Sequence, residues 1–523
     1  MPTFAAIDIG SNSCRLKIAR VVSHRLKTIH EDREVTRLGS SVFETGLVSP
    51  DAMAATLRAL KRFQRAVQAH GVDQMRVVAT AAMRDARNAP AFQAWVKAET
   101  GWNMEIISGL EEGRLIHRGV MQNEPGARGR VLLVDLGGGS CEITLSEHRR
   151  IKETVSLPLG AVRLTEEFLQ ADPAPADGIR RMRQLIAREL RRASRRIAAT
   201  RVPLVIATSG TAAALVEACV AAQKPANKRS ARRPARNATA ATALGGTALA
   251  PDVRKLAARL AKMALPEREA VPGIGLRRAE IIVAGAQVFA ELLETFSLRG
   301  FRYSLLGLRD GILAQMLAEQ DARAAVHREL EHERWESVVS TAKRYSVDLR
   351  QAEPVRAHAL QLFRDLKGLH GLPPEYEAWL SAASVLRDIG KFVNHQGHHR
   401  HTQYIISSSE MYGFTQLQRT IVSAIARYMG KSRPQAGDRA LRNIPAEEHK
   451  NVQSAVLLLR LAVALNQDRA SDVLRFAARV YPKRVYLEVK QGRTGAELEL
   501  WSLRKEADYF REVFGRELFA TVA

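Results

Sequence analysis

The chain has 523 residues, of which 46% are apolar and 26% charged. This is the composition of a folded protein of about three domains, and it excludes a disordered chain or a fibre. Lys and Arg number 79 against 55 Asp and Glu, and the net charge of +24 predicts affinity for polyanions. No stretch reaches about 18 uncharged apolar residues and the N-terminus lacks an apolar leader, so we expect no membrane span and a cytoplasmic location.

The first half of the chain alternates strand and helix patterns. The segments FAAIDIG (4–10) and CRLKIARVV (14–22) indicate two strands joined by a polar turn, before an amphipathic helix over 52–69 and a strand over 75–80. From about residue 130, RVLLVDLGGGSCEITLS repeats the order of apolar strand, Asp, small residues, Ser and apolar strand. We therefore predict an α/β fold with an internal duplication.

A strongly basic window follows over residues 180–236, with fifteen Lys or Arg and two acids. Apolar residues recur at every third or fourth position over 179–197, which predicts a helix with its arginines on the opposite face. That face is either a solvated surface or a track for a polyanion. Residues 223–250 lack periodicity and are rich in Ala, Arg, Thr, Pro and Asn, which indicates a flexible insertion.

From about residue 320 the helical pattern dominates, as in 355–366 and 454–466, with one strand-like run over 484–490. We therefore predict that the C-terminal third is mainly helical.

The two strand-to-turn segments carry the first candidate chemistry. In IDIGSNS and VDLGGGS an aspartate ends a buried strand, and small residues follow that let backbone N–H groups approach an anion. If the two copies face each other, Asp8 and Asp135 present hard oxygen ligands for Mg²⁺, with Glu142 as a third carboxylate. Two matched copies favour a phosphate site over a pair of ordinary turns.

Between the two copies lie an arginine and a pair of glutamates. Arg84 follows a strand-to-turn segment, where a guanidinium can clamp a phosphoryl group with two hydrogen bonds. Glu111 and Glu112 follow the small pair Ser108-Gly109 at the start of a helix. Spacing alone leaves open whether they act chemically or only stabilise the helix N-terminus.

Seven segments in order resemble the exopolyphosphatase/guanosine pentaphosphate phosphohydrolase family: AIDIGSNSCRL, ATAAMRDARN, ISGLEEGRLI, LLVDLGGGSCEI, LPLGAVRLTEEF, ATSGTAAAL and YSLLGLRDGIL. The resemblance implies two actin-like (ribonuclease H-like) α/β domains with a cleft between them, over 1–125 and 126–318. The remaining residues, 319–523, resemble the helical, HD-like domain of longer family members.

The resemblance also implies roles for single residues. Glu112 maps onto the family's general base and Arg84 onto its arginine, while Asp8, Asp135 and Glu142 map onto metal ligands for Mg²⁺ or another hard cation such as Mn²⁺. The implied phosphate-binding residues are Ser11, Asn12, Ser13, Gly137, Gly138, Gly139, Ser140, Ser209, Gly210 and Thr211.

The implied activity is that of an exopolyphosphatase, which removes terminal phosphate processively from inorganic polyphosphate. The alternative substrate is guanosine pentaphosphate (pppGpp), and a homodimer is implied as well. Two remote alternatives are an ATP-dependent kinase or chaperone, disfavoured because 281–289 lacks an adenosine-pocket Gly-Gly turn, and a nucleic-acid-binding protein. For the latter we expect only weak, nonspecific polyanion binding, because no reading motif is present.

Several residues depart from the family pattern. Cys14 and Cys141 stand beside the two turns, and we interpret them as small buried side chains rather than redox switches. Arg387 precedes Asp388 where an HD site needs a His-Asp pair, which disfavours a second metal site. The histidines over 395–401 are more consistent with a structural role, whereas Arg400, Arg427 and Arg469 are candidates for lining a polyanion channel.

Overall fold

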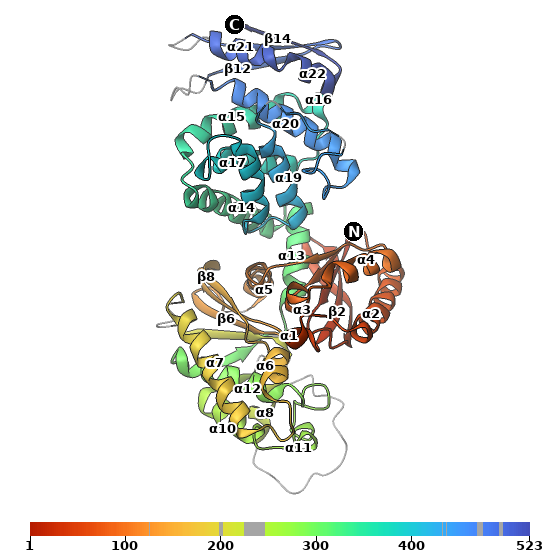
Figure 1. The fold of residues 1–523 in the computed structure, drawn as a ribbon, viewed down its shortest axis with the longest axis vertical. Coiled ribbons are helices and arrows are strands. Elements are labelled where there is room, and N and C mark those ends of the chain that lie inside the picture. Colours follow the sequence, from red (N-terminus) through yellow and green to blue (C-terminus); the bar gives the residue numbers. More distant parts are fainter. Residues whose placement is uncertain are drawn as a thin grey trace. The chain divides into compact units, whose positions relative to one another are not determined.

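The computed structural model describes residues 1–124, 126–197, 202–223, 246–430, 432–435, 437–467, 474–490 and 495–522. It consists of two compact units, Met1–Val326 and His327–Ala523 (Figure 1). The predicted Arg469 and residues 224–245 of the predicted insertion lie outside the described residues.

The first unit begins with a five-stranded sheet in the order β3-β2-β1-β4-β5. Its strands are β1 (Thr3–Ile9), β2 (Ser13–Val22), β3 (Arg25–Val35), β4 (Gln74–Ala79) and β5 (Met104–Ile106). The central strand β1 is buried on both faces, which explains its almost unbroken apolar run. Its helices are α1 (Val42–Thr45), α2 (Pro50–Ala69), α3 (Ala81–Asp85) and α4 (Ala89–Thr100).

A second, six-stranded sheet repeats this topology in the order β10-β11-β9-β6-β7-β8. Its strands are β6 (Arg130–Leu136), β7 (Cys141–Glu147), β8 (Arg150–Leu157), β9 (Leu204–Thr208), β10 (Thr247–Leu249) and β11 (Gly300–Tyr303). In each sheet three strands form an antiparallel meander, and the next strand pairs in parallel with the first of them. The predicted α/β duplication is therefore present.

The two sheets exchange helices. Helix α5 (Gly109–Asn123) follows the first sheet in sequence but packs on β7 and β8, whereas α13 (Leu308–Gln320) follows the second sheet and packs on β1, β2 and β3. The two helices pack against each other, and the ten consecutive residues Glu112–Met121 of α5 are buried. This exchange brings the start of α5 under the second sheet.

Further helices cover the second sheet: α6 (Ala161–Phe168), α7 (Ala176–Ser194), α8 (Ser209–Gln223), α10 (Ala250–Leu260), α11 (Leu265–Glu269) and α12 (Ile282–Thr295). The apolar stripe of α7 is buried, while its arginines are exposed and several pair with nearby acids, as in Arg181–Asp177 at 2.9 Å. This supports the solvated-face interpretation. The prediction of a flexible insertion is wrong for 247–250, because β10 is anchored by antiparallel pairing with β11.

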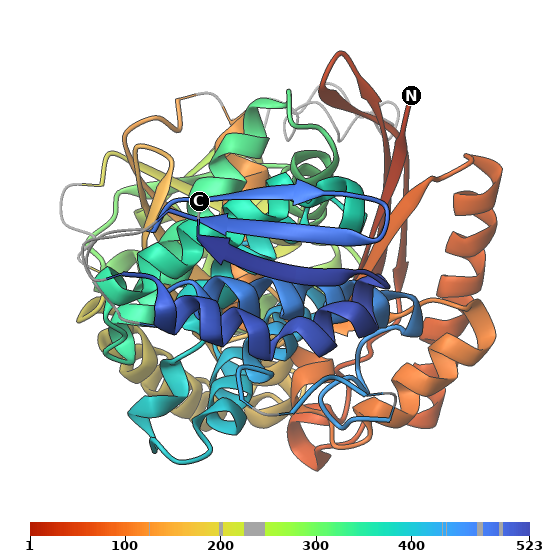
Figure 2. The same ribbon diagram turned by 90° about the horizontal axis from the view of Figure 1, so that it is seen from above.

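The second unit is mainly helical, as predicted. It contains α14 (Ala325–Arg344), α15 (Leu349–Asp365), α16 (Lys367–His370), α17 (Tyr376–Leu386), α18 (His398–Ser408), α19 (Gln416–Arg427) and α20 (His449–Ala464). Helices α21 (Glu497–Lys505) and α22 (Ala507–Phe514) pack beside a sheet of β12 (Phe476–Val480), β13 (Arg484–Val489) and β14 (Glu517–Val522), as Figure 2 shows. No helix within the described residues is long and apolar enough for a bilayer span.

Candidate active site

The two predicted turns have the same local structure. In the first, the backbone N–H of Gly10 donates to the carbonyl of Ser13 at 3.2 Å; in the second, Gly137 donates to Ser140 at 2.9 Å. Each turn closes the antiparallel hairpin whose first strand carries the aspartate, and Asp135 lies opposite Glu142 in the register of β6 and β7. The repeat in sequence is thus a repeat in geometry.

The turns also lie against each other. A Cβ atom added at Gly138 would stand 2.9 Å from the Cβ of Ser11, and one added at Gly139 would stand 2.6 Å from the Cβ of Ala81. Real Cβ atoms do not approach this closely, so only glycine permits the contact. Gly138 and Gly139 of the second turn are therefore explained by the contact of this turn with the first turn and with α3.

Glu112 reaches the second sheet through close packing of α5. The Oγ atom of Ser108 caps the helix by accepting from the N–H of Glu111 at 3.1 Å. A Cβ at Gly109 would lie 2.1 Å from the Oγ of Ser156, so the first turn of α5 presses against β8. Glu112 is thereby buried beside β7 and β8.

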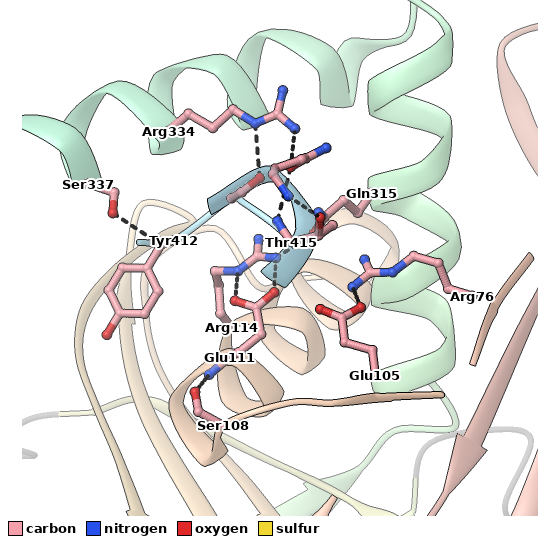
Figure 3. A network of polar contacts seen from close by, with 12 residues as sticks. Arg76, Glu105, Ser108, Glu111, Arg114, Gln315, Arg334, Ser337, Tyr412 and Thr415 are labelled. Carbon is pink, nitrogen blue, oxygen red and sulfur yellow. Dashed lines mark hydrogen bonds and ion pairs between the residues drawn. The ribbon is translucent and has the colours of Figure 1, made fainter. Parts of the chain in front are cut away.

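Glu111 and Glu112 have different surroundings. The Glu111 carboxylate accepts two hydrogen bonds from Arg114, at 2.8 and 2.7 Å, and Arg114 also contacts Gln315 (Figure 3). The Glu112 carboxylate instead accepts from Arg84 at 2.9 Å and lines a cavity. The structure therefore assigns Glu111 a structural contact and places only Glu112 in the candidate site.

Three carboxylates converge at this point. Oxygen atoms of Glu112, Asp135 and Glu142 all lie within 4.8 Å of one another, the only such group of three acidic, His or Cys ligands found among the described residues. Asp8 lines the same cavity but is not in this group, so the structure gathers two of the three predicted metal ligands together with the predicted base.

The carboxylate group is short of positive partners. Thr208 donates to Asp135 and Ser156 donates to Glu142 at 2.7 Å, but the other carboxylate oxygen of Glu142 is buried and has no partner within the described parts of the chain. Burial raises the pKa of all three carboxyls, and the neighbouring Asp135 carboxylate raises those of Glu112 and Glu142 further. Such a donor set fits a hard divalent cation, which would neutralise the crowded charge.

Arg84 joins the two halves of the site. At the end of α3 it donates to the Ile107 carbonyl and to Glu112, both at 2.9 Å, and to the Oγ of Ser140 in the second turn at 3.2 Å. One guanidinium thus contacts both the candidate base and a phosphate-binding turn, which is where a transferring phosphoryl group would be held.

The turns, Glu112 and Asp135 line a cavity of about 310 Å³. All the predicted site residues line it except Arg84 and Glu142, which contact or adjoin lining residues. It is also lined by four arginines: Arg15, Arg33, Arg278 and Arg309. Within the described part of the chain, no carboxylate lies within salt-bridge distance of these four groups, so the cavity is suited to an anion.

The pKa shifts of the cavity arginines also indicate a site for an anion. Burial, together with the neighbouring Arg15, lowers the pKa of Arg33 to about 9 and that of Arg278 to about 10. Two side-chain nitrogens of Arg33 are buried without a partner among the described atoms. The repulsion among these groups is relieved when an anion lies between them.

The third predicted phosphate turn, Ser209–Thr211, lies at the start of α8. Ser209 adopts a left-handed conformation with φ of 80°, and its Oγ is buried without a partner among the described residues. A Cβ at Gly210 would stand 1.5 Å from a guanidinium nitrogen of Arg278. The turn therefore supplies a free hydroxyl while its glycine makes room for an arginine.

Sequence reasoning missed Arg15, Arg33, Arg278 and Arg309 as site residues. Arg15 and Arg309 lie inside the quoted segments SNSCRL and LGLRDGIL. Their position in these segments could have identified them as candidate site residues. Arg33 lies in the half-exposed strand β3 and Arg278 before α12, and only the tertiary fold brings them to the cavity.

Comparison with known proteins bears on this geometry. The model of the Ppx/GppA phosphatase family matches residues 17–320, and that of Ppx/GppA phosphatase domain III matches residues 334–512. The chain belongs to the Ppx/GppA phosphatase family. Its fold class, two-sheet α/β followed by a helical domain III region, is therefore confirmed.

Two solved structures illustrate the likeness of this Ppx/GppA chain. An exopolyphosphatase from Cytophaga hutchinsonii is 27% identical with a TM-score of 0.54, the match covering 61% of this chain and 98% of that one. The Ppx/GppA family member of Aquifex aeolicus is 30% identical with a TM-score of 0.49, covering 61% of this chain and 99% of that one.

Two further predictions concern the cysteines beside the turns and the segment 281–289. Cys14 and Cys141 are buried, as predicted, and burial raises the pKa of the Cys14 thiol to about 12. The segment 281–289 of this Ppx/GppA phosphatase lies largely in the buried helix α12, and a Cβ at Gly285 would stand 2.5 Å from Thr211. Gly285 is therefore a position of close core packing between α12 and α8.

Proposed function

We propose that this protein is an exopolyphosphatase that hydrolyses the terminal phosphoanhydride bond of inorganic polyphosphate, with Glu112 as general base. The observation that carries the proposal is the meeting of the carboxylates of Glu112, Asp135 and Glu142 with two glycine-rich turns at one arginine-lined cavity. Membership of the phosphatase family supports the proposed hydrolysis. The four arginines that line the cavity favour a substrate with several phosphates.

The residues divide the work of the reaction. Asp135 and Glu142, with Asp8 lining the same cavity, would hold Mg²⁺ or Mn²⁺, which supplies charge neutralisation at the phosphate oxygens when bound. The backbone N–H groups of the turns and Arg84 orient the terminal phosphoryl group. Ser209 contributes its hydroxyl, which has no hydrogen-bond partner among the residues that the structure describes.

Glu112 is buried and faces the cavity, where a water in line with the terminal anhydride can donate its proton to the carboxylate. The water oxygen bonds to phosphorus, and the bridging oxygen leaves with the shortened chain. Orthophosphate is released, and the reaction is processive because the shortened chain stays bound for the next cleavage.

The alternative substrate is guanosine pentaphosphate, whose 5′ end presents the same terminal anhydride. The net charge of +24 favours the polymer. Phosphate release from long-chain polyphosphate and from guanosine pentaphosphate is compared at equal enzyme; we expect the polymer to be the better substrate by kcat/KM. Faster turnover of the nucleotide would reject this assignment.

We also propose a cytoplasmic homodimer, as the family resemblance implies. Light scattering at several concentrations tests the assembly, and a mass of 57.8 kDa throughout would reject it.

A further inference from the structure

The two strand carboxylates of the candidate cation site lie in one row that crosses four adjacent strands of the second sheet. In the middle of the row, Asp135 on β6 lies opposite Glu142 on β7. On one side, Thr208 on β9 lies opposite Asp135. On the other side, Ser156 on β8 lies opposite Glu142. Because directly opposed residues share one face of a sheet, a hydroxyl side chain flanks the carboxylate pair on each side.

Each hydroxyl is bound to one oxygen of the neighbouring carboxylate. Thr208 donates to Oδ1 of Asp135, and Ser156 donates to Oε1 of Glu142 at 2.7 Å. A Cβ atom added at Gly109 would stand 2.1 Å from the Oγ of Ser156 and 3.4 Å from Oε1 of Glu142. The first turn of α5 therefore encloses the hydrogen bond between Ser156 and Glu142.

The second oxygen of Glu142 is the one that is left for a cation. Glu142 is only 2% exposed, and its Oε2 has no hydrogen-bond partner among the described residues. A buried oxygen without a partner costs free energy, and a bound Mg²⁺ or Mn²⁺ would remove that cost. Since Ser156 occupies Oε1, Glu142 presents a single oxygen in a fixed orientation.

The first sheet provides an internal comparison. Asp8 is the counterpart of Asp135 in the duplicated topology, and it lies opposite Val78 on β4 and Arg15 on β2. Neither neighbour carries a hydroxyl, and Arg15 occupies the position that Glu142 has in the second sheet. Asp8 is also the predicted metal ligand outside the group of three converging carboxylates. The flanking hydroxyls thus accompany the strand carboxylates that converge.

We propose that Thr208 and Ser156 are positioning residues of the cation site, each fixing one carboxylate oxygen so that the other is presented to the ion. Neither residue lines the cavity, so both act through Asp135 and Glu142 rather than by touching the substrate. The presence of a cation rests on the proposed function, whereas the two hydrogen bonds belong to the geometry itself. Removing a partner that orients a metal ligand typically weakens metal binding about 10- to 100-fold.

The test measures Mn²⁺ binding to the full chain without substrate, from the electron paramagnetic resonance signal of free Mn²⁺. We expect T208V and S156A each to raise the Kd for Mn²⁺ by about 10- to 100-fold. T208S restores the hydroxyl and is expected to return the Kd close to the wild-type value. Asp135→Asn is expected to abolish stoichiometric binding, which locates the ion at this site.

The matched control is T144V/T154V. Thr144 and Thr154 form the next opposed pair on the same face of β7 and β8, and their hydroxyls hydrogen-bond each other at 2.7 Å. Replacing both partners leaves no unpaired hydroxyl and does not touch a carboxylate donor, so the wild-type Kd is expected. Thermal unfolding establishes that each variant is folded, and T208V with T208S decides the test if S156A does not fold.

Four results would overturn the proposal: no stoichiometric Mn²⁺ binding by the wild type, binding that survives Asp135→Asn, a wild-type Kd in folded T208V or S156A, or a T208S variant as weak as T208V. An equal loss in T144V/T154V would likewise reduce the hydroxyls to core packing and overturn it. Phosphate release from polyphosphate is measured separately. A chain that binds Mn²⁺ through these hydroxyls but releases no phosphate would reject the proposed function and leave this inference standing.

Discussion

Arg163 links the second turn to helices α3 and α1, and its removal tests how much that link matters for the site. Its guanidinium donates to the carbonyl of Gly139 at 2.8 Å, pairs with Asp85, and lies 4.1 Å from the ring of Phe43. Asp85 directly follows Arg84, which contacts Glu112. Arg163 therefore acts as a positioning residue for α3 and for the turn.

The magnitude follows from these contacts. A hydrogen bond from a charged donor contributes about 1.5–3 kcal/mol, whereas the ion pair with half-exposed Asp85 and the contact with Phe43 add about 0.2–1 kcal/mol each. Losing about 2–5 kcal/mol at this junction lets Arg84 and the turn move apart. For Arg163→Ala we therefore expect kcat to fall by about 10- to 100-fold, with KM changed less, since the four arginines that line the cavity remain.

Steady-state phosphate release from polyphosphate, with thermal unfolding in parallel, measures this effect. Arg195→Ala serves as the control, because Arg195 is exposed and does not line the cavity. Arg163→Lys retains the charge but loses the bidentate reach, and an intermediate kcat is expected. A folded Arg163→Ala enzyme with the wild-type kcat would refute the positioning role.

Two predictions concern stability. Burial raises the pKa of Glu166, which accepts a hydrogen bond from the Ser41 N–H at 3.1 Å, from 4.5 to about 7. Because the raised pKa favours the protonated form in the folded state, Glu166 makes wild-type stability fall as pH rises from 4.5 towards about 7. E166Q removes this contribution and makes the fall with pH shallower; superimposable Tm-against-pH curves would contradict this. Gly139→Ala is expected to lose about 1–3 kcal/mol of unfolding free energy by overpacking against Ala81, measured by chemical denaturation. The control Gly129→Ala, where an added Cβ meets nothing within 4 Å, should be near neutral, and equal losses in both variants would argue against the close turn contact.

The sequence predicted those parts of the fold that depend on local pattern. Strands β1 and β6 are continuous apolar runs ending in Asp, and their duplication was readable for that reason. Strand β3 was not predicted, because its residues alternate charge at a half-exposed edge and lack an apolar stripe. Strand β10 was missed because its three residues follow a segment without periodicity.

The sequence predicted some residues of the candidate site, whereas others are brought to it only by the tertiary fold. The family resemblance predicted Glu112 as the base. The structure separates it from Glu111 because the Glu111 carboxylate accepts two hydrogen bonds from Arg114. The convergence of Glu112 with Glu142 depends on the helix exchange between sheets, which no spacing in the sequence encodes. Arg278 likewise reaches the cavity only through tertiary packing.

The neighbouring glutamates provide the most direct test of the central claim. Phosphate release from long-chain polyphosphate is measured at saturating Mg²⁺ for Glu112→Gln and Glu111→Gln, with circular dichroism to establish folding. Removing the general base is expected to lower kcat by about 10²- to 10⁴-fold in Glu112→Gln, while Glu111→Gln stays near the wild-type rate. A folded Glu112→Gln enzyme that turns over like the wild type would contradict the account.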